Sequence, residues 1–197
     1  MGSNMEKEEV KVSKEKLIKA YKVAYNLGDK KSAIILEELF GAEVFQPKNI
    51  MERVKTFEDA VRELGATHPL VRTFNSISPV DDKNLIAYAK LRIIVAALNE
   101  GWIPPQDCKT NVWYCCHWLY TKDELDGMSN EEKAERHMLD ITGKYHGTSC
   151  GFGSVRSNYA PSYTTAIVGS RFCFKTRELA EYCGKQFIEL WADFRLI

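Results

Sequence analysis

The apolar pattern of this 197-residue chain changes its period near residue 100. Before that point apolar residues recur every three or four positions, the spacing of helices that bury one face. Residues 84–99 are apolar nearly all round, and Gly101 with Pro104-Pro105 ends this central helix. Residues 112–120 are then rich in aromatic and β-favouring side chains, which is typical of a strand. Helices followed by strands predict an α+β fold.

The helices expected in the first half form two groups. Residues 14–27 and 30–40 carry amphipathic patterns with a glycine stop between them, so residues 5–45 are predicted to form a helical hairpin. A polar, proline-containing break follows. Residues 49–197 are then expected to form a separate α+β domain.

The domain predicted over residues 49–197 has two parts. Its helical part spans 49–103, and its sheet-plus-helix part spans 110–197. Within the second part, residues 147–174 predict two or three short strands separated by glycine turns. Thr176 caps a closing amphipathic helix. The prediction is a small antiparallel β-sheet in the C-terminal half, because no parallel βαβ unit is visible.

The overall charge excludes one class of function. The chain has 27 Lys plus Arg and 27 Asp plus Glu, so it does not coat nucleic acid by bulk positive charge. Residues 1–4, which precede a second methionine, resemble an expression-vector remnant and are left out of the fold prediction. No apolar run reaches 18 residues, and the six cysteines have the character of reduced thiols. We therefore expect no membrane partner and a cytoplasmic location.

Charge is unevenly distributed in the C-terminal half. Residues 141–177 contain five basic and no acidic residues, whereas residues 122–140 contain seven acidic and three basic ones. The two windows either pair with each other or leave a local positive surface. Within the basic window, residues 147–165 are mostly Gly, Ser, Thr, Asn and Tyr. That composition is typical of recognition surfaces, and equally of tight turns between strands.

Six residues of the basic window form the predicted ligand-contact set: Phe152, Arg156, Asn158, Tyr159, Tyr163 and Arg171. The arginines are expected to hold an anion, and the tyrosines to stack on the ligand. Arg171 has a second interpretation, in which it pairs with an acidic residue of the closing helix. Trp113 and Trp118 are expected in the core, because large aromatic side chains are usually mostly buried. The alternative for both is that they stack on bases of a nucleic-acid ligand.

Several short patterns suggest catalytic or metal chemistry but lack its context. Residues 147–151 match G-x-S-x-G, yet all four histidines precede Ser149, and turn-forming residues follow it. Cys150 with His146 shows no third group to orient the pair. Residues 115–117 (Cys-Cys-His) alternate between strand faces and do not supply four zinc ligands. We expect no cofactor, no metal and no catalysis, with a small cysteine-dependent enzyme as one alternative.

Several motifs carry a family resemblance: KTFEDA (55–60), AYAKLRII (87–94), ALNEGW (97–102), GSRFCFKTRELAEY (169–182) and GKQF (184–187). Over about residues 49–197 the chain resembles a large group of uncharacterised proteins from phages and prophages of gut Bacteroidales. The resemblance implies no known activity and no catalytic residues. It implies a Gly/Ser/Tyr-rich segment similar to the variable surface of phage lectin-like binding proteins, and residence in a bacterial host.

These observations predict a phage-type, non-enzymatic binding protein. Its partner is predicted to be an anionic ligand, either a nucleotide or a nucleic acid, or else a host or phage protein. A virion structural or assembly protein, with the hairpin mediating assembly, is the other alternative. The sequence leaves open both self-association and which face of the sheet is exposed.

Overall fold

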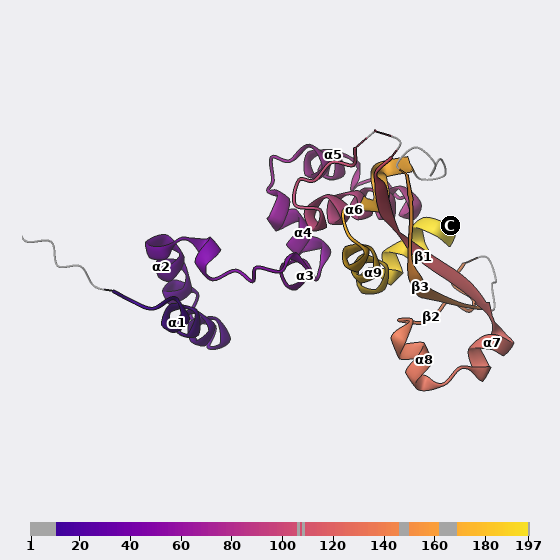
Figure 1. Ribbon diagram of the computed structural model, residues 1–197, viewed down its shortest axis with the longest axis horizontal. Helices are drawn as coiled ribbons and strands as arrows, with labels where there is room; N and C mark the ends of the chain where they lie inside the picture. Colours follow the sequence, from indigo (N-terminus) through magenta and orange to yellow (C-terminus); the bar gives the residue numbers. More distant parts are fainter. Residues whose placement is uncertain (1–10, 106, 108, 146–149, 162–168, 197) are drawn as a thin grey trace, which may run out of the picture. The chain divides into compact units, whose positions relative to one another are not determined.

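The computed structural model describes residues 11–105, 107, 109–145, 150–161 and 169–196 (Figure 1). The chain divides into two compact units, Met1–Lys48 and Asn49–Ile197, and each is described by itself. In the second unit short helices precede a small antiparallel sheet, and helices close the chain, so the α+β prediction is confirmed.

The first unit is a helical hairpin of α1 (Lys14–Asn26) and α2 (Lys30–Phe40), followed by the short 3-10 helix η1 (Ala42–Val44). Side-chain caps define where both helices begin. The hydroxyl of Ser13 accepts a hydrogen bond from the Lys16 amide at 3.3 Å. The carboxylate of Asp29 accepts one from the Ser32 amide at 3.2 Å. Each cap satisfies an amide that the helix itself cannot pair.

The helical part of the second unit is organised around its last and longest helix. Its helices are α3 (Ile50–Arg53), α4 (Phe57–Leu64), α5 (Pro69–Ile77) and α6 (Lys83–Leu98). The side chains of Leu91, Ile94 and Leu98 in α6 are fully buried. Helices α4 and α5 pack against α6, which confirms its predicted central place. No helix among the described residues is long and apolar enough to cross a membrane.

Four strands form one antiparallel sheet in the order β2-β3-β1-β4: β1 (Asn111–Thr121), β2 (Leu139–Asp140), β3 (Cys150–Pro161) and β4 (Cys173–Phe174). For residues 147–174 the sequence predicts short strands broken by glycine turns. That prediction is wrong for residues 150–161. β3 instead runs without a turn through Gly151 and Gly153 and pairs with β1 along its whole length.

Close packing explains the glycines of β3. A Cβ atom at Gly151 would lie 2.8 Å from the Met138 sulfur, and one at Gly153 would lie 2.9 Å from the Met138 methyl carbon. Met138 follows the two short helices α7 (Lys122–Gly127) and α8 (Asn130–Glu135). The glycines therefore allow this segment to approach the strand, a recognised use of glycine in a sheet.

The closing segment contains two helices, α9 (Arg177–Gln186) and α10 (Ile188–Leu196), where the sequence predicts one. The break falls at Phe187, whose side chain is buried. Neither glycine nor proline marks this position, and the apolar spacing continues through it, so the sequence gives no signal of a break. The indole N–H of Trp191 donates to the Cys183 carbonyl across the break at 3.3 Å.

One buried amide joins the end of α6 to the sheet edge. Asn99 is 4% exposed. Its side-chain N–H donates to the Cys173 carbonyl at 2.8 Å, and its side-chain oxygen accepts from the Lys175 amide at 3.1 Å. Both polar ends of the buried side chain are thus paired, which is the condition for burying an amide at low cost. The contact holds β4, which directly follows the 3-10 helix η2 (Gly169–Phe172).

Candidate functional site

One face of the β1–β3 pair is covered by α9 (Figure 1). The Cys115 thiol donates to the Ala180 carbonyl at 3.1 Å, and the Nε2–H of His117 donates to the Gly184 carbonyl at 3.0 Å. Gly184 permits this approach, because a Cβ atom there would lie 3.2 Å from the Ser154 hydroxyl. Odd-numbered residues of β1 therefore face the helices, because successive side chains point to opposite sides of a strand.

The middle of the opposite face is exposed. Trp118 is 62% exposed, although it lies inside a paired strand. Arg156 and Asn158 on β3 are also exposed, and Cys116 is half-buried. Cys116 lies directly opposite Arg156 in the register. We call the patch formed by Cys116, Trp118, Arg156 and Asn158 the open face.

Both ends of the open face are closed by packing. At one end Val112 and Tyr114 form a small cluster with Cys173, and Trp102 packs on it. At the other end Met138 covers the glycines of β3. The open face is therefore a bounded patch in the middle of the sheet.

A β-bulge lies within the patch. Cys116 pairs with Arg156 but His117 pairs with Ser154, so β3 has one additional residue at position 155. A bulge bends and twists its strand locally, and bulges are frequent next to functional sites because they re-aim a side chain. Here the additional residue directly precedes Arg156, the charged member of the open face.

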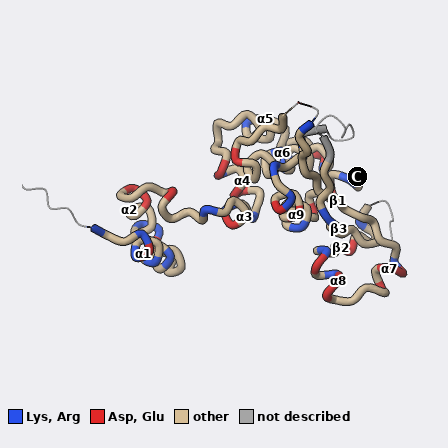
Figure 2. The backbone as a smooth tube through the Cα atoms, in the orientation of Figure 1, with Lys and Arg blue, Asp and Glu red and all other residues tan. Residues whose placement is uncertain are grey.

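The electrostatics of the open face are positive. β1 and β3 contain no Asp or Glu (Figure 2). Arg156 is the only Lys or Arg in the two strands. Arg195 lies beside β1 and donates to the Cys115 carbonyl at 3.3 Å. Burial raises the pKa of the Cys116 thiol, and the nearby charges of Arg195 and Arg156 oppose that rise. Among the described residues Arg156 forms no ion pair, so it is available to an anion. Arg195 instead packs over the Trp191 ring on the helix-covered side of the sheet.

The structure separates the predicted ligand contacts. Arg156 and Asn158 share the open face, but Tyr159 points to the opposite side, where its ring lies 5.3 Å from that of Trp113. Phe152 is only 2% exposed and stacks on the His117 ring in the core, so we remove it from the contact set. Its strand position gives the reason, because it faces the helices.

The remaining predicted contacts lie elsewhere. Arg171 is exposed at the end of η2, and no ion pair joins it to the closing helices within the described part of the chain. Tyr163 lies outside the described residues. Two other basic residues of the window are neutralised: Lys175 pairs with Glu100 at 2.9 Å and Arg177 with Glu181 at 2.8 Å. The positive surface is therefore smaller than the sequence suggests.

Trp118 is the residue that the sequence interpretation placed wrongly. It was expected in the core, and the structure exposes it at the centre of the open face. Alternation along residues 112–120 already assigns Trp118 to one face with Cys116. What the sequence does not show is that α9 covers the other face.

The structure gives little support to a catalytic cysteine, which the sequence left as an alternative. Burial, with a contribution from Cys183, raises the pKa of the Cys115 thiol, and burial raises the pKa of Cys173 to about 11. A raised pKa disfavours the nucleophilic thiolate. Cys150 is half-buried, and its suggested partner His146 lies outside the described residues. Among the residues that the structure describes, no three His, Cys, Asp or Glu side chains gather as a metal site.

Comparison of the chain with protein-family models, with curated proteins and with solved structures finds no match. The resemblance to phage proteins stays a prediction. Function must therefore be argued from the chemistry of the open face.

Proposed function

We propose that this is a non-enzymatic binding protein that recognises a nucleotide or a single-stranded nucleic acid on the open face. Trp118 stacks on a base, Arg156 holds a phosphate, and Asn158 supplies hydrogen bonds. The phage origin and the cytoplasm of a bacterial host belong to the same proposal. The sequence resemblance supports them, as do the free thiols of Cys115, Cys116, Cys150 and Cys183 in the described part of the chain.

The single observation that carries the proposal is the exposure of Trp118 near the Arg156 guanidinium, which forms no ion pair with any residue that the structure describes. A tryptophan in the middle of a paired strand normally packs on something, because it carries more apolar surface than most side chains. An antiparallel sheet with exposed aromatic and cationic side chains is a common platform for single strands. Stacking of one base is worth about 1–3 kcal/mol.

The positions of the side chains fit one nucleotide unit. Trp118 lies two residues from Cys116, and Cys116 is opposite Arg156. Trp118 and Arg156 therefore lie diagonally across the bulge on one face, an arrangement that long side chains can span. Asn158 is next along β3 on the same face. Its side-chain oxygen accepts from the Tyr159 amide at 2.9 Å, which leaves the amide N–H₂ to donate to a ligand.

Fluorescence anisotropy with a labelled oligothymidylate tests this proposal. Trp118→Ala should weaken binding roughly tenfold or more, and Arg156→Gln should weaken it and reduce its salt dependence. Leu119→Ala is the matched control, because Leu119 is the next residue, is 48% exposed and faces the other side. We expect Leu119→Ala to bind as the wild type does.

Two outcomes would overturn the proposal. One is that neither the oligothymidylate nor its mononucleotide binds the wild-type protein at low salt. The other is that Trp118→Ala and Leu119→Ala have the same affinity as the wild type while binding persists. In the second case the open face is not the site, and a search for a protein partner of that face follows.

A further inference from the structure

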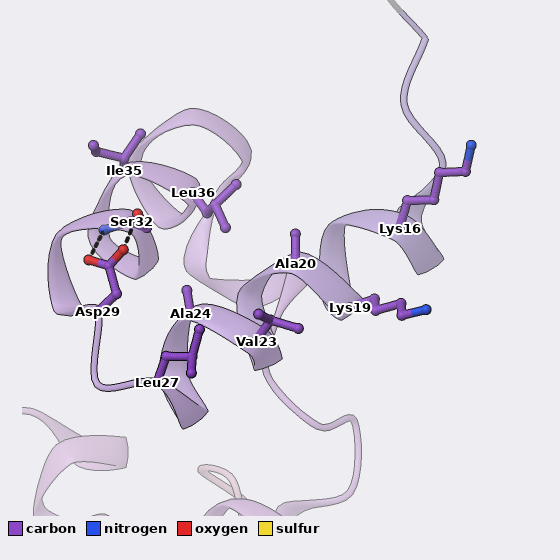
Figure 3. A pocket seen from close by; sticks show the side chains of 10 residues that line it. All are labelled: Lys16, Lys19, Ala20, Val23, Ala24, Leu27, Asp29, Ser32, Ile35 and Leu36. Carbon is purple, nitrogen blue, oxygen red and sulfur yellow. Dashed lines mark hydrogen bonds between the residues drawn. The ribbon is translucent and has the colours of Figure 1, made fainter.

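The N-terminal hairpin carries an open apolar groove between its two helices (Figure 3). The groove has a volume of about 670 Å³ and is lined along α1 by Ala20, Val23 and Leu27, and along α2 by Ile35 and Leu36. Val23 is 51% exposed, Leu27 78% and Ile35 56%. A soluble helix normally buries such a stripe against another element.

The hairpin cannot obtain a sufficient core from its own residues. The Tyr21 ring stacks on the Phe45 ring at 4.6 Å, and neither residue lines the groove. Among residues 11–48 the buried apolar side chains are those of Ala24, Ala33 and Phe45. Helices of 13 and 11 residues are marginal in water without tertiary packing. The open groove is therefore the surface where further packing would stabilise them.

Charges of opposite sign lie at the two ends of the groove. Lys16 and Lys19 line one end, and Asp29 lines the other (Figure 3). Hydrogen bonds from Ser32 lower the pKa of Asp29, so its carboxylate is ionised at neutral pH. The groove thus has a positive end, an apolar middle and a negative end, and this pattern is complementary to itself when reversed.

From this geometry we infer that the hairpin is a self-association module. Two copies of the chain pack groove to groove in antiparallel orientation, and the four helices form a bundle. Each copy places Lys16 and Lys19 near Asp29 of the other copy, and the two apolar stripes bury each other. A twofold contact of this kind is isologous, because the same surface serves both copies. Bundles of four helices with short loops are a common result of such packing.

The charge pattern favours a second copy over a different partner. An acidic peptide would satisfy Lys16 and Lys19 but would be repelled by Asp29 at the other end. A basic partner would have the opposite problem. A second copy in reversed orientation places an opposite charge at both ends of the groove. This inference does not depend on the proposed function of the open face.

Sedimentation equilibrium of the full chain over a wide concentration range tests the inference. We expect a reversible monomer–dimer equilibrium, with the dimer at twice the chain mass of 22.5 kDa. Ile35→Glu should raise the dimer dissociation constant by roughly tenfold or more, because it places a charge in the apolar contact. Ile34→Glu is the matched control, since Ile34 is also 56% exposed but does not line the groove. The control should dimerise normally.

A milder variant keeps the test valid if Ile35→Glu unfolds the hairpin. Asp29→Asn retains a good helix cap and removes only the charge, so helicity by circular dichroism should be unchanged. We expect it to weaken the dimer several-fold and to reduce the effect of salt on association. A wild-type monomer at every concentration would overturn the inference. Equal dissociation by Ile34→Glu and Ile35→Glu would overturn it as well.

Discussion

The two units of this chain differ in how they bury apolar residues. Residues 49–197 bury large side chains around α6, among them Leu91, Ile94 and Trp191, and their exposed apolar residues are scattered. The hairpin buries two alanines and Phe45 and leaves a continuous apolar stripe in contact with water. The difference indicates that the second unit is stable by its own packing. The hairpin leaves exposed the apolar surface that the proposed association would bury.

Replacing a central side chain of the second unit should give the largest effect. Leu91→Ala removes a fully buried side chain from α6, and we expect it to lower the free energy of unfolding by about 3 kcal/mol. Denaturant unfolding followed by tryptophan fluorescence measures this, since all four tryptophans lie after residue 100. A loss below about 1 kcal/mol would show that the α6 core relaxes more freely than its burial suggests.

Removing the Asn99 side chain should give the second-largest loss in free energy of unfolding. Asn99→Ala leaves the Cys173 carbonyl and the Lys175 amide without this partner, and we expect a loss of about 2 kcal/mol by the same measurement. Asn26→Ala in the hairpin is the control, because Asn26 is exposed at the end of α1. If both variants unfolded alike, the second unit would not depend on the buried amide.

His117 should make the second unit sensitive to acid. Burial lowers its pKa to about 4 from an ordinary value of 6.5, so between these values the unfolded chain binds a proton that the folded chain does not. The contribution of His117 to the free energy of unfolding is therefore fully present above about pH 6.5 and is lost as the pH falls toward 4. Between pH 7.5 and 5.5 we expect a loss of about 1 kcal/mol from this residue. His117→Phe should lack this part of the pH dependence, and an unchanged pH profile would contradict the assignment.

Replacing an exposed leucine of the hairpin should have the smallest effect on the unfolding of the second unit. Leu27 is 78% exposed. Leu27→Ala should therefore change the free energy of unfolding measured by tryptophan fluorescence by less than about 0.5 kcal/mol. The same substitution should reduce the dimer fraction in sedimentation. A large loss in the tryptophan signal would instead show that the two units are energetically coupled.

Local signals made much of the fold predictable. Ser13 and Asp29 mark where α1 and α2 begin, and the glycine and prolines after residue 100 follow the end of α6. The break at Phe187 had no such signal, since it depends on tertiary packing. The glycines of β3 were misinterpreted as turns because their reason, the approach of Met138, comes from a distant segment.

The candidate site was predictable only in part. Arg156 and Asn158 differ by two residues and share a face, whereas Tyr159 differs from them by odd numbers and does not. Alternation would have shown this if residues 150–161 had been predicted as one strand. The exposure of Trp118 was not predictable, because it is set by α9, which packs from about 60 residues further along the chain.

The Asn99 contact also bears on the order in which the chain folds. It joins α6 to the carbonyl of a residue 74 positions away. The helices before residue 100 form from local contacts, whereas β4 pairs with only two residues of β1 and closes a long loop. Closing long loops has an entropic cost that must be met before the contact gains anything. We therefore expect α6 to form first. β4 and its hydrogen bonds to the Asn99 side chain should form later.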